Sequence, residues 1–488
     1  MTKRFHMKKI FLAATLLFAA GCSKELTEDP RGLVGGAEAL SSQAGLESAL
    51  TGAYGSLMVP WTSGFTSVSQ IAMTMGADDL TTHPGSNKEE FREFDRFNVT
   101  SLNGRMTPIW LGCYKTIQST TNIINNYSRV TDGDATKTQT IVGEASFLRA
   151  LCYYWLTRFW GEVPIIPSEI YSPEFLTLKK SKPADVYKLI EEDLARAEQW
   201  VPNKKRDPGR PNKGSVKALL ADVYLTEAGW PLKDQSKYAL AAAKAKEVID
   251  NKAAYGFDLF QDGFLKIFVG GTKEDVFTLF TRGQWSTYNS FYGLSTMPEN
   301  EGGWSDFFPE LKFFNNFPAG KRKDATFSTE FVVGGNTIPW QQTTTKHPYY
   351  KKFTIQQDGD KAVYMSNNPV IMIRYAHVLL IYAEAQARAT GTPNSEAYAA
   401  INAVRDRAGL APLAANLSGA DFAAAVVNER AWEFAGEWSR WFDLVRLDQV
   451  AAANAGKDPG DLQPAAAITQ ADYWLPIPGV DALVNPNL

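Results

Sequence analysis

Long stretches of the chain repeat apolar residues at the spacing of an α-helix with one buried face. In 143–166 the stripe is Phe147, Leu148, Leu151, Tyr154, Trp155 and Phe159, and Gly161 and Pro164 then end the helix. Apolar stripes of the same period occur in the segments 44–58, 183–201, 213–229, 237–250, 371–390, 395–410 and 423–438. A chain with this period over most of its length predicts a mainly α fold.

Some of these helices follow one another as pairs with many small residues. The pair 213–229 and 237–250 is rich in alanine, and so is the pair 371–390 and 395–410. Small residues let two helices pack closely, and stacked pairs then bury one another. We interpret the pairs as a degenerate tetratricopeptide-like scaffold.

The middle of the chain has a different composition. From 255 to 365 it is rich in Gly, Pro, Asn and aromatic residues and has little helical period. Short strands and long ordered loops are expected there, and such loops often carry function. We divide the chain into a helical part at 41–254 and a part at 255–488 with a loop-rich, minor-β insertion at 255–365, and expect one compact unit.

The N-terminus has the layout of an export signal. Four cations between positions 3 and 9 precede an apolar run at 10–20, which is too short to span a membrane. The run ends in Ala-Gly-Cys and resembles a bacterial lipobox, which implies cleavage of the signal peptide 1–21 and a lipid on Cys22. Residues 22–40 then form an acidic linker that ties the protein to a membrane.

Composition excludes several classes of protein. The formal net charge is −3, so no basic field attracts nucleic acid. Beyond Cys22 only Cys113 and Cys152 remain, in apolar helical segments, which fits two buried thiols or a single disulfide. With no His-Glu-x-x-His, Cys-x-x-Cys or Gly-x-Ser-x-Gly motif, we predict no catalytic residue, metal or cofactor.

Two motifs suggest chemistry but have simpler explanations. Gly209 and Gly214 have the spacing of a phosphate loop, but Ser215 stands where that loop needs lysine, so a loop entering a helix is expected. Glu433 and Glu437 are four residues apart, as a glycosidase pair on a helix could be. Arginines at helical spacing, Arg430 and Arg440, instead favour ion pairing along that helix.

Aromatic residues are the positive indication of a ligand. Trp285, Tyr288, Phe291, Tyr292 and Trp304 fall within 20 residues, among Asn and Glu side chains. A sugar binds with its apolar face on Trp or Tyr, while polar groups bond its hydroxyl rim. The alternative is that these rings fill the core of a region short of aliphatic residues.

Further candidates lie in the first part of the chain. Trp61 and Trp110 are second-rank platforms, whereas Tyr153, Trp155, Phe159, Trp432 and Trp441 have helical spacing and are expected in the core. Asp78 and Asp79 leave a helix-like segment for a loop, where they either contact ligand or cap the helix end. We predict that the loop after Asp79 joins the 285–304 cluster to form the ligand site.

Several blocks of sequence together resemble the SusD/RagB family of surface lipoproteins. The family's patterns are matched at 143–166, 209–225, 373–385 with 401–410, 429–447 and the tail 473–488. The resemblance implies four tetratricopeptide-like units with an irregular ligand-facing side, and no catalysis. It also implies that the protein sits on the outer membrane, captures oligosaccharides and serves a TonB-dependent transporter of the SusC type.

Three alternatives stay open at this point. The first is an assembly or lid protein for the transporter, without its own sugar site. The second is a protein that binds a peptide instead of a glycan, as some members of the family do. Least favoured is a lipid-anchored glycoside hydrolase.

Overall fold

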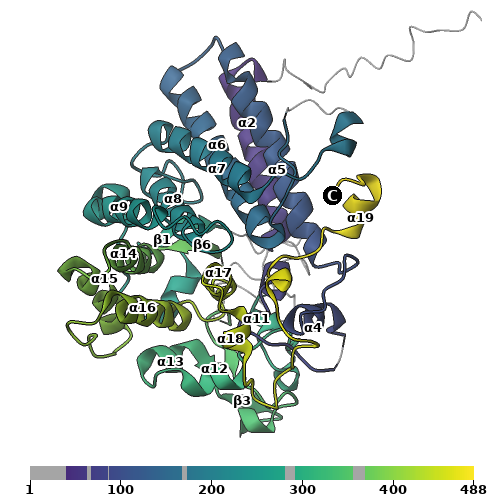
Figure 1. The fold of residues 1–488 in the computed structure, drawn as a ribbon, viewed down its shortest axis with the longest axis vertical. Coiled ribbons are helices and arrows are strands. Elements are labelled where there is room, and N and C mark those ends of the chain that lie inside the picture. The colour runs from purple at the N-terminus through teal and green to yellow at the C-terminus, as the bar shows by residue number, and fades with distance from the viewer. Residues whose placement is uncertain (1–39, 63–67, 86, 168–172, 281–291, 355–368) are drawn as a thin grey trace, which may run out of the picture.

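The computed structural model describes residues 40–62, 68–85, 87–167, 173–280, 292–354 and 369–488 (Figure 1). Long helices dominate the N-terminal half. They are α2 (Gln43–Thr62), α5 (Met106–Asn126), α6 (Ala135–Trp160), α7 (Pro183–Trp200), α8 (Lys213–Glu227) and α9 (Lys237–Asp250). Helices α2 and α5, α6 and α7, and α8 and α9 pack as neighbouring pairs, which confirms the mainly α scaffold.

A fourth pair continues this scaffold in the C-terminal half. It consists of α14 (Tyr375–Thr390) and α15 (Ser395–Arg407), and α14 packs against both α9 and α16 (Gly419–Glu433). Helix α14 therefore joins the two halves of the chain through side chains that are almost all buried.

The predicted helix at 371–390 begins four residues late. Residues Val370–Arg374 form the buried strand β6, which pairs antiparallel with β1 (Asp275–Leu279). The predicted helix at 423–438 also differs: α16 starts at Gly419 and ends at Glu433. Gly436 follows with a φ of 75°, a conformation that glycine adopts readily and a continuing helix cannot include.

The described residues of the loop-rich region form short elements, as expected. The helices there are α10 (Lys252–Tyr255), η5 (Phe264–Val269), α11 (Tyr292–Ser295), η6 (Glu299–Glu301), α12 (Leu311–Asn316), α13 (Lys321–Thr326) and η7 (Trp340–Gln342). Besides β1, its described strands form two small antiparallel pairs, β2 (Phe327–Ser328) with β5 (Tyr349–Tyr350) and β3 (Glu330–Val333) with β4 (Asn336–Pro339). The β content of the described residues is therefore minor.

Further short helices connect the scaffold to the loops. They are α3 (Ser69–Ala72), α4 (Glu89–Asp95), η3 (Tyr127–Arg129), η4 (Pro173–Thr177), α17 (Arg440–Arg446), α18 (Val450–Asn454), η9 (Gln470–Tyr473) and α19 (Gly479–Val484). The loop before α8 is fixed by a capping box, in which Asn212 and Ser215 bond each other's backbone N–H. This arrangement explains the glycine-containing motif there as a helix start.

One large apolar core runs through the scaffold. Tyr153, Trp155, Phe159 and Trp441 are buried in it, as their helical spacing predicts. Trp110 is buried as well, with its ring 5.0 Å from that of Trp160, so its proposed role as a ligand platform was wrong. Its place on the buried face of α5 is the physical reason.

The two remaining cysteines face each other in this core. Cys113 and Cys152 are free, buried thiols, which decides between the two alternatives left by the sequence. A hydrogen bond with Cys152 and burial raise the pKa of Cys113. Within the described residues, no helix combines the length and the apolar character needed to cross a membrane.

Candidate functional site

Two segments that are far apart in the sequence lie side by side at the loop-rich end of the molecule. Thr81 and Phe308 form an antiparallel β-bridge with N···O distances of 2.8 and 3.1 Å. The Thr82 hydroxyl donates a hydrogen bond to the carbonyl oxygen of Asp306 at 2.7 Å. The loop that follows α3 is thus fixed against the turn that carries Trp304, which are the two segments that the sequence analysis paired.

Trp304 is half-buried in a tight turn. Its backbone N–H donates to the carbonyl oxygen of Leu294 at 2.9 Å. A Cβ at the preceding Gly303 would lie 2.2 Å from the carbonyl oxygen of Met297, so only glycine fits there. The turn fixes the backbone of Trp304 and leaves part of the residue accessible, as an aromatic platform requires.

A buried ion pair holds the start of α4 against this turn. The Lys88 ammonium lies 2.5 Å from a carboxylate oxygen of Asp306, and both side chains are almost buried. Burial raises the pKa of Asp306, and the charge of Lys88 offsets part of that rise. The pair thus places two charged side chains, Lys88 and Asp306, between the start of α4 and the turn that carries Trp304.

The segment from His83 to Gly85 is held by hydrogen bonds from Arg92 of α4 and to the ring of His83. Arg92 donates to the carbonyl oxygens of His83 and Gly85 at 3.2 and 2.5 Å. The Gly85 N–H donates to Nδ1 of His83 at 2.9 Å. The other ring nitrogen of His83, Nε2, is buried and has no hydrogen-bond partner in the described part of the chain.

Asp78 and Asp79, two of the predicted ligand residues, are engaged within the protein. Arg440 donates to both carboxylate oxygens of Asp78 at 2.7 and 2.9 Å. Asp79 is fully buried, and its Oδ2 accepts the Gly436 N–H at 2.9 Å. Burial, only partly offset by that hydrogen bond, raises the pKa of Asp79 to about 7. In this structure Asp79 anchors the start of the loop and presents no oxygen to solvent.

For the other predicted ligand residues, the structure gives at most their position in a helix. Trp61 falls in the last turn of α2, and Tyr292 begins α11. Trp285 and Tyr288 lie outside the described residues, as does the predicted lipidation site Cys22. Of the predicted aromatic cluster, the structure therefore describes the surroundings of Trp304.

Sequence reasoning missed His83, Lys88, Arg92 and Asp306. Each is a common polar residue in a loop or at a helix end, and no spacing pattern distinguishes it. Only the folded chain brings Lys88 next to Asp306. A search for charged residues flanking the predicted loop would have found Lys88 and Arg92 but not their partners.

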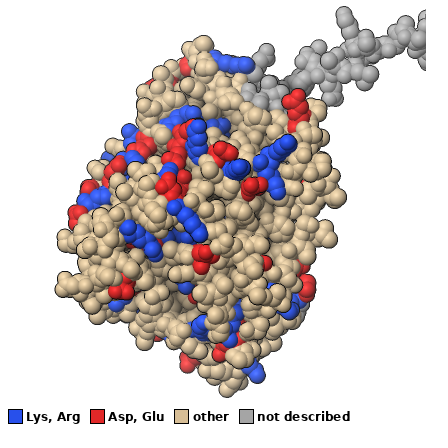
Figure 2. Space-filling view, viewed as in Figure 1, with Lys and Arg blue, Asp and Glu red and all other residues tan. Residues whose placement is uncertain are grey.

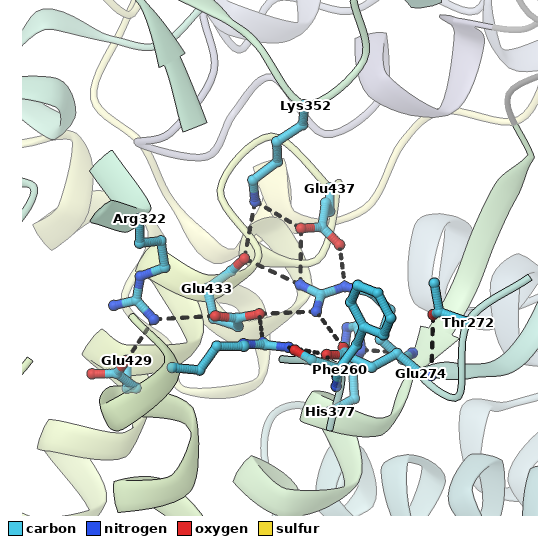
Figure 3. Close-up of polar contacts among 11 residues, drawn as sticks. Phe260, Thr272, Glu274, Arg322, Lys352, His377, Glu429, Glu433 and Glu437 are labelled. Carbon is cyan, nitrogen blue, oxygen red and sulfur yellow. Dashed lines mark hydrogen bonds and ion pairs between the residues drawn. The ribbon is translucent and has the colours of Figure 1, made fainter. Parts of the chain in front are cut away.

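A second polar cluster is larger and entirely buried (Figure 3). At its centre Arg374 contacts Glu274, Glu433 and Glu437, each at 2.9 Å. Further ion pairs join Arg407 to Glu274 and Glu433, Arg322 to Glu429 and Glu433, and Lys352 to Glu437. We call these residues the Arg374 cluster.

The Arg374 cluster corrects the interpretation of Glu433 and Glu437. They do not share a helix, because α16 ends at Glu433, and their partners are not Arg430 and Arg440. Burial alone would raise the pKa of Glu433, but the neighbouring Arg407 and Arg374 outweigh it and lower the pKa to about 2. Ion pairing was the correct explanation, although between distant segments.

Arg430 and Arg440 have other partners. Arg430 pairs with Asp443 at 2.8 Å, and Arg440 pairs with Asp78. The two predicted flanking cations thus fix α17 and the loop that follows α3. Among the residues that the structure describes, no group of three or more His, Cys, Asp or Glu could hold a metal ion.

Two family models match the chain. One, described as the SusD family, matches residues 326–488. The other, described as "Starch-binding associating with outer membrane", matches residues 38–225. The two matches together cover most of the helical scaffold.

Curated relatives match over nearly the whole length. "SusD-like protein P2" of Formosa agariphila is 28% identical, and the match covers 98% of each chain. A "SusD-like protein" of Bacteroides ovatus is 26% identical, with 90% of this chain and 82% of the relative covered.

Solved structures share the fold. A SusD superfamily protein from Parabacteroides distasonis has a TM-score of 0.78 at 25% identity, covering 91% of this chain and 98% of the other. A "Laminarin binding SusD-like protein" has a TM-score of 0.75 at 23% identity, with 91% and 98% covered. The surface glycan-binding protein A of Bacteroides uniformis has a TM-score of 0.77 at 22% identity, with 92% and 99% covered.

The fold and the site define a class of protein, in which stacked helical pairs support an irregular face of ordered loops. The chain belongs to the SusD/RagB family, as its sequence blocks indicated.

Proposed function

We propose that this protein is an outer-membrane receptor that captures oligosaccharides and delivers them to a TonB-dependent transporter of the SusC type. Membership of the SusD/RagB family supports the proposal, because one matching family model is described as starch-binding and associated with the outer membrane. Two proteins of the same fold are named for binding laminarin and surface glycans. The observation that carries the proposal is the half-buried Trp304, in a turn that a β-bridge between Thr81 and Phe308 holds against the segment after α3.

The chemistry of this edge suits a sugar. The apolar face of a pyranose would lie on the indole of Trp304. Trp285, Tyr288 and Tyr292 would supply further platforms, with Trp61 as a second-rank one. Asp78 and Asp79 would act mainly by holding the loop, since Arg440 and a backbone N–H already occupy them.

The membrane association would depend on the N-terminus. We propose that the signal peptide 1–21 is cleaved and that lipid on Cys22 anchors the mature chain in the outer membrane, facing outward. Residues 22–40 would then be the tether. Mass spectrometry of the N-terminal peptide from purified membranes tests this, and an unmodified peptide containing Cys22 would contradict it.

We propose no catalytic role. The only carboxylate pair that the sequence offered for glycosidase chemistry, Glu433 and Glu437, is consumed by the Arg374 cluster. Release of reducing ends from bound polysaccharide by the purified protein would contradict this part of the proposal.

The sugar site is tested with a soluble form that begins after Cys22. A glycan array first identifies a ligand, and calorimetry then compares Trp304→Ala with wild type. Stacking of one ring is worth about 1–2 kcal/mol, so affinity should fall about 5- to 30-fold. Trp432→Ala, which changes a half-buried Trp on α16, is the matched control and should bind as wild type does. Equal affinity in Trp304→Ala would overturn the assigned site.

A further inference from the structure

A cavity of about 420 Å³ lies where α14 packs against α9 and α15 (Figure 1). Helix α14 contributes Tyr375, Leu379 and Tyr382, which share one face of the helix because they are spaced i, i+4, i+7. The loop that follows α10 contributes Leu259. Pockets for small organic ligands have volumes of about 300–1,000 Å³ and mainly apolar walls, so this cavity has a suitable size. We call it the α14 pocket.

One wall of the α14 pocket is built from alanine. Helix α15 lines the pocket with Ala399, Ala400 and Ala403. In the sequence, the alanines of this helix pair indicate only that the two helices pack closely. In the folded chain, the short side chains of these three leave space beside α14 that larger residues would fill. The wall is therefore smooth and apolar, which suits a planar ring.

One polar group of the wall is unsatisfied. Tyr375 is only 2% exposed and lines the α14 pocket, and its hydroxyl has no hydrogen-bond partner among the described residues. Tyr382 differs, because its hydroxyl donates to Glu396 at 3.2 Å and accepts from Asn394 at 3.3 Å. A buried hydroxyl without a partner is costly, and a ligand oxygen in the pocket would satisfy it. The hydroxyl of Tyr375 thus favours a ligand that carries a hydrogen-bond acceptor.

The charged side chains at the α14 pocket occur in groups of opposite sign. Lys246 contacts Asp250 at 2.6 Å and Glu396 at 3.1 Å, and Lys252 contacts Asp258 at 2.6 Å. Figure 2 shows the same mixture of Lys and Arg with Asp and Glu on the flank where Figure 1 places α9. Each cation at the pocket is therefore already paired with a carboxylate of the protein.

This charge arrangement disfavours a charged ligand. Burial and the charges of Asp258 and Asp250 raise the pKa of Tyr375, so its hydroxyl stays protonated and both carboxylates act on it. The same carboxylates would repel an anion bonded to the hydroxyl. A cation would be repelled by Lys246 and Lys252, which already neutralise these carboxylates. An uncharged ligand meets neither repulsion.

We propose that the α14 pocket binds an uncharged aromatic compound with a carbonyl oxygen. The ring lies against the alanines of α15, and the oxygen accepts a hydrogen bond from the hydroxyl of Tyr375. This site is independent of the proposed function, because none of the residues that line the pocket belongs to the loop or the turn that hold Trp304.

The test uses the soluble form that begins after Cys22 and three probes of the same shape. Benzamide is neutral and has a carbonyl acceptor, benzoate is an anion, and benzamidine is a cation without an acceptor. Ligand-observed NMR titrations should give a dissociation constant of about 1 mM for benzamide, as expected of a fragment of this size. The values for the two ions should be about tenfold higher or more. Equal binding of the three probes would overturn the proposal.

Two variants locate the benzamide site. Tyr375→Phe removes only the hydroxyl and should weaken benzamide binding about 2- to 10-fold. Tyr238→Phe is the matched control, because Tyr238 is 5% exposed on α9 but does not line the pocket, and it should bind as wild type does. Ala399→Trp fills the pocket from an exposed position and should abolish binding while the circular dichroism spectrum stays that of wild type.

The remaining outcomes separate this site from the sugar site. Benzamide binding that neither Tyr375→Phe nor Ala399→Trp changes would lie elsewhere and overturn the assignment. Methyl β-glucoside is the sugar probe. If it binds more tightly than benzamide and Ala399→Trp abolishes its binding, the pocket is a second sugar site and the aromatic class is wrong. Trp304→Ala should leave benzamide binding unchanged, and Tyr375→Phe should leave glycan binding unchanged, so failure of one proposal is distinguishable from failure of the other.

Discussion

Two fully buried carboxylates, Glu433 in the Arg374 cluster and Asp79 at the start of the site loop, have pKa values displaced in opposite directions. Burial raises both. Around Glu433 the cations Arg407 and Arg374 outweigh burial and bring the pKa to about 2. Asp79 is held chiefly by one backbone N–H, so its pKa rises to about 7.

The difference shows how the two regions are built. In the Arg374 cluster, buried side chains of opposite charge from several distant segments pair with one another, which fixes the scaffold (Figure 3). The site loop is instead held by a β-bridge, one ion pair and carbonyl contacts. That arrangement leaves Trp304 half-buried. The scaffold should respond to substitution mainly in stability, and the loop mainly in binding.

The largest expected effect is on the Arg374 cluster. Arg374→Met leaves three buried glutamates short of a cation and should lower the free energy of unfolding by about 3–5 kcal/mol. Arg388→Met is the control, because Arg388 is 26% exposed and its partner Glu384 keeps a second arginine. It should cost less than about 1 kcal/mol. Equal losses in urea denaturation would contradict the central role of the cluster.

The next largest loss of stability is expected when the ion pair between Lys88 and Asp306 is broken. Lys88→Met leaves Asp306 buried without its cation and should cost about 2 kcal/mol at pH 7. Because burial already raises the pKa of Asp306, protonation should reduce this loss near pH 4. The double variant Lys88→Met/Asp306→Asn should recover most of the stability. Denaturation at both pH values measures it, and a loss independent of pH would argue against a buried charge.

A smaller effect, which depends on pH, is expected at Asp79. Its folded pKa of about 7 lies above the unfolded value of about 3.9, so its contribution to stability is complete below about pH 4 and is lost as pH rises toward 7. Asp79→Asn cannot ionise. Relative to wild type it should gain about 1 kcal/mol or more between pH 4 and pH 8.

The neighbouring residue provides the comparison for this prediction. Asp78→Asn breaks the ion pair with Arg440 and should be less stable than wild type at pH 8. Melting temperatures at pH 4 and pH 8 distinguish the two variants. A parallel pH dependence of Asp79→Asn and wild type would show that Asp79 ionises normally.

The smallest effect on stability is expected for an exposed ion pair on the surface of the helical scaffold. Lys246 lies 2.6 Å from Asp250 and 3.1 Å from Glu396, and both acids are more than half exposed. Lys246→Ala should cost about 0.5 kcal/mol or less, and the loss should disappear in 1 M salt. A loss comparable with that of Arg374→Met would remove the distinction between buried and exposed charges on which the comparison rests.

The fold was largely predictable because helical periodicity is local. The predicted segments 183–201 and 237–250 agree with α7 and α9 to within one residue. The helix predicted at 371–390 lost its first four residues to β6 because β6 pairs with β1, about 95 residues earlier in the chain. Pairing over such a distance overrides a local preference that the sequence shows plainly.

For the site, the sequence by itself determined the chemical inventory: aromatic residues in a loop-rich segment, an acidic loop start, and no catalytic or metal motif. Tertiary structure decided which of these residues meet. It buried Trp110, engaged Asp79 with Gly436, and set Lys88 beside the turn of Trp304. The reason is that sequence periodicity shows only on which face of its helix a residue lies. Its burial and its ion-pair partners depend on segments that can be hundreds of positions away.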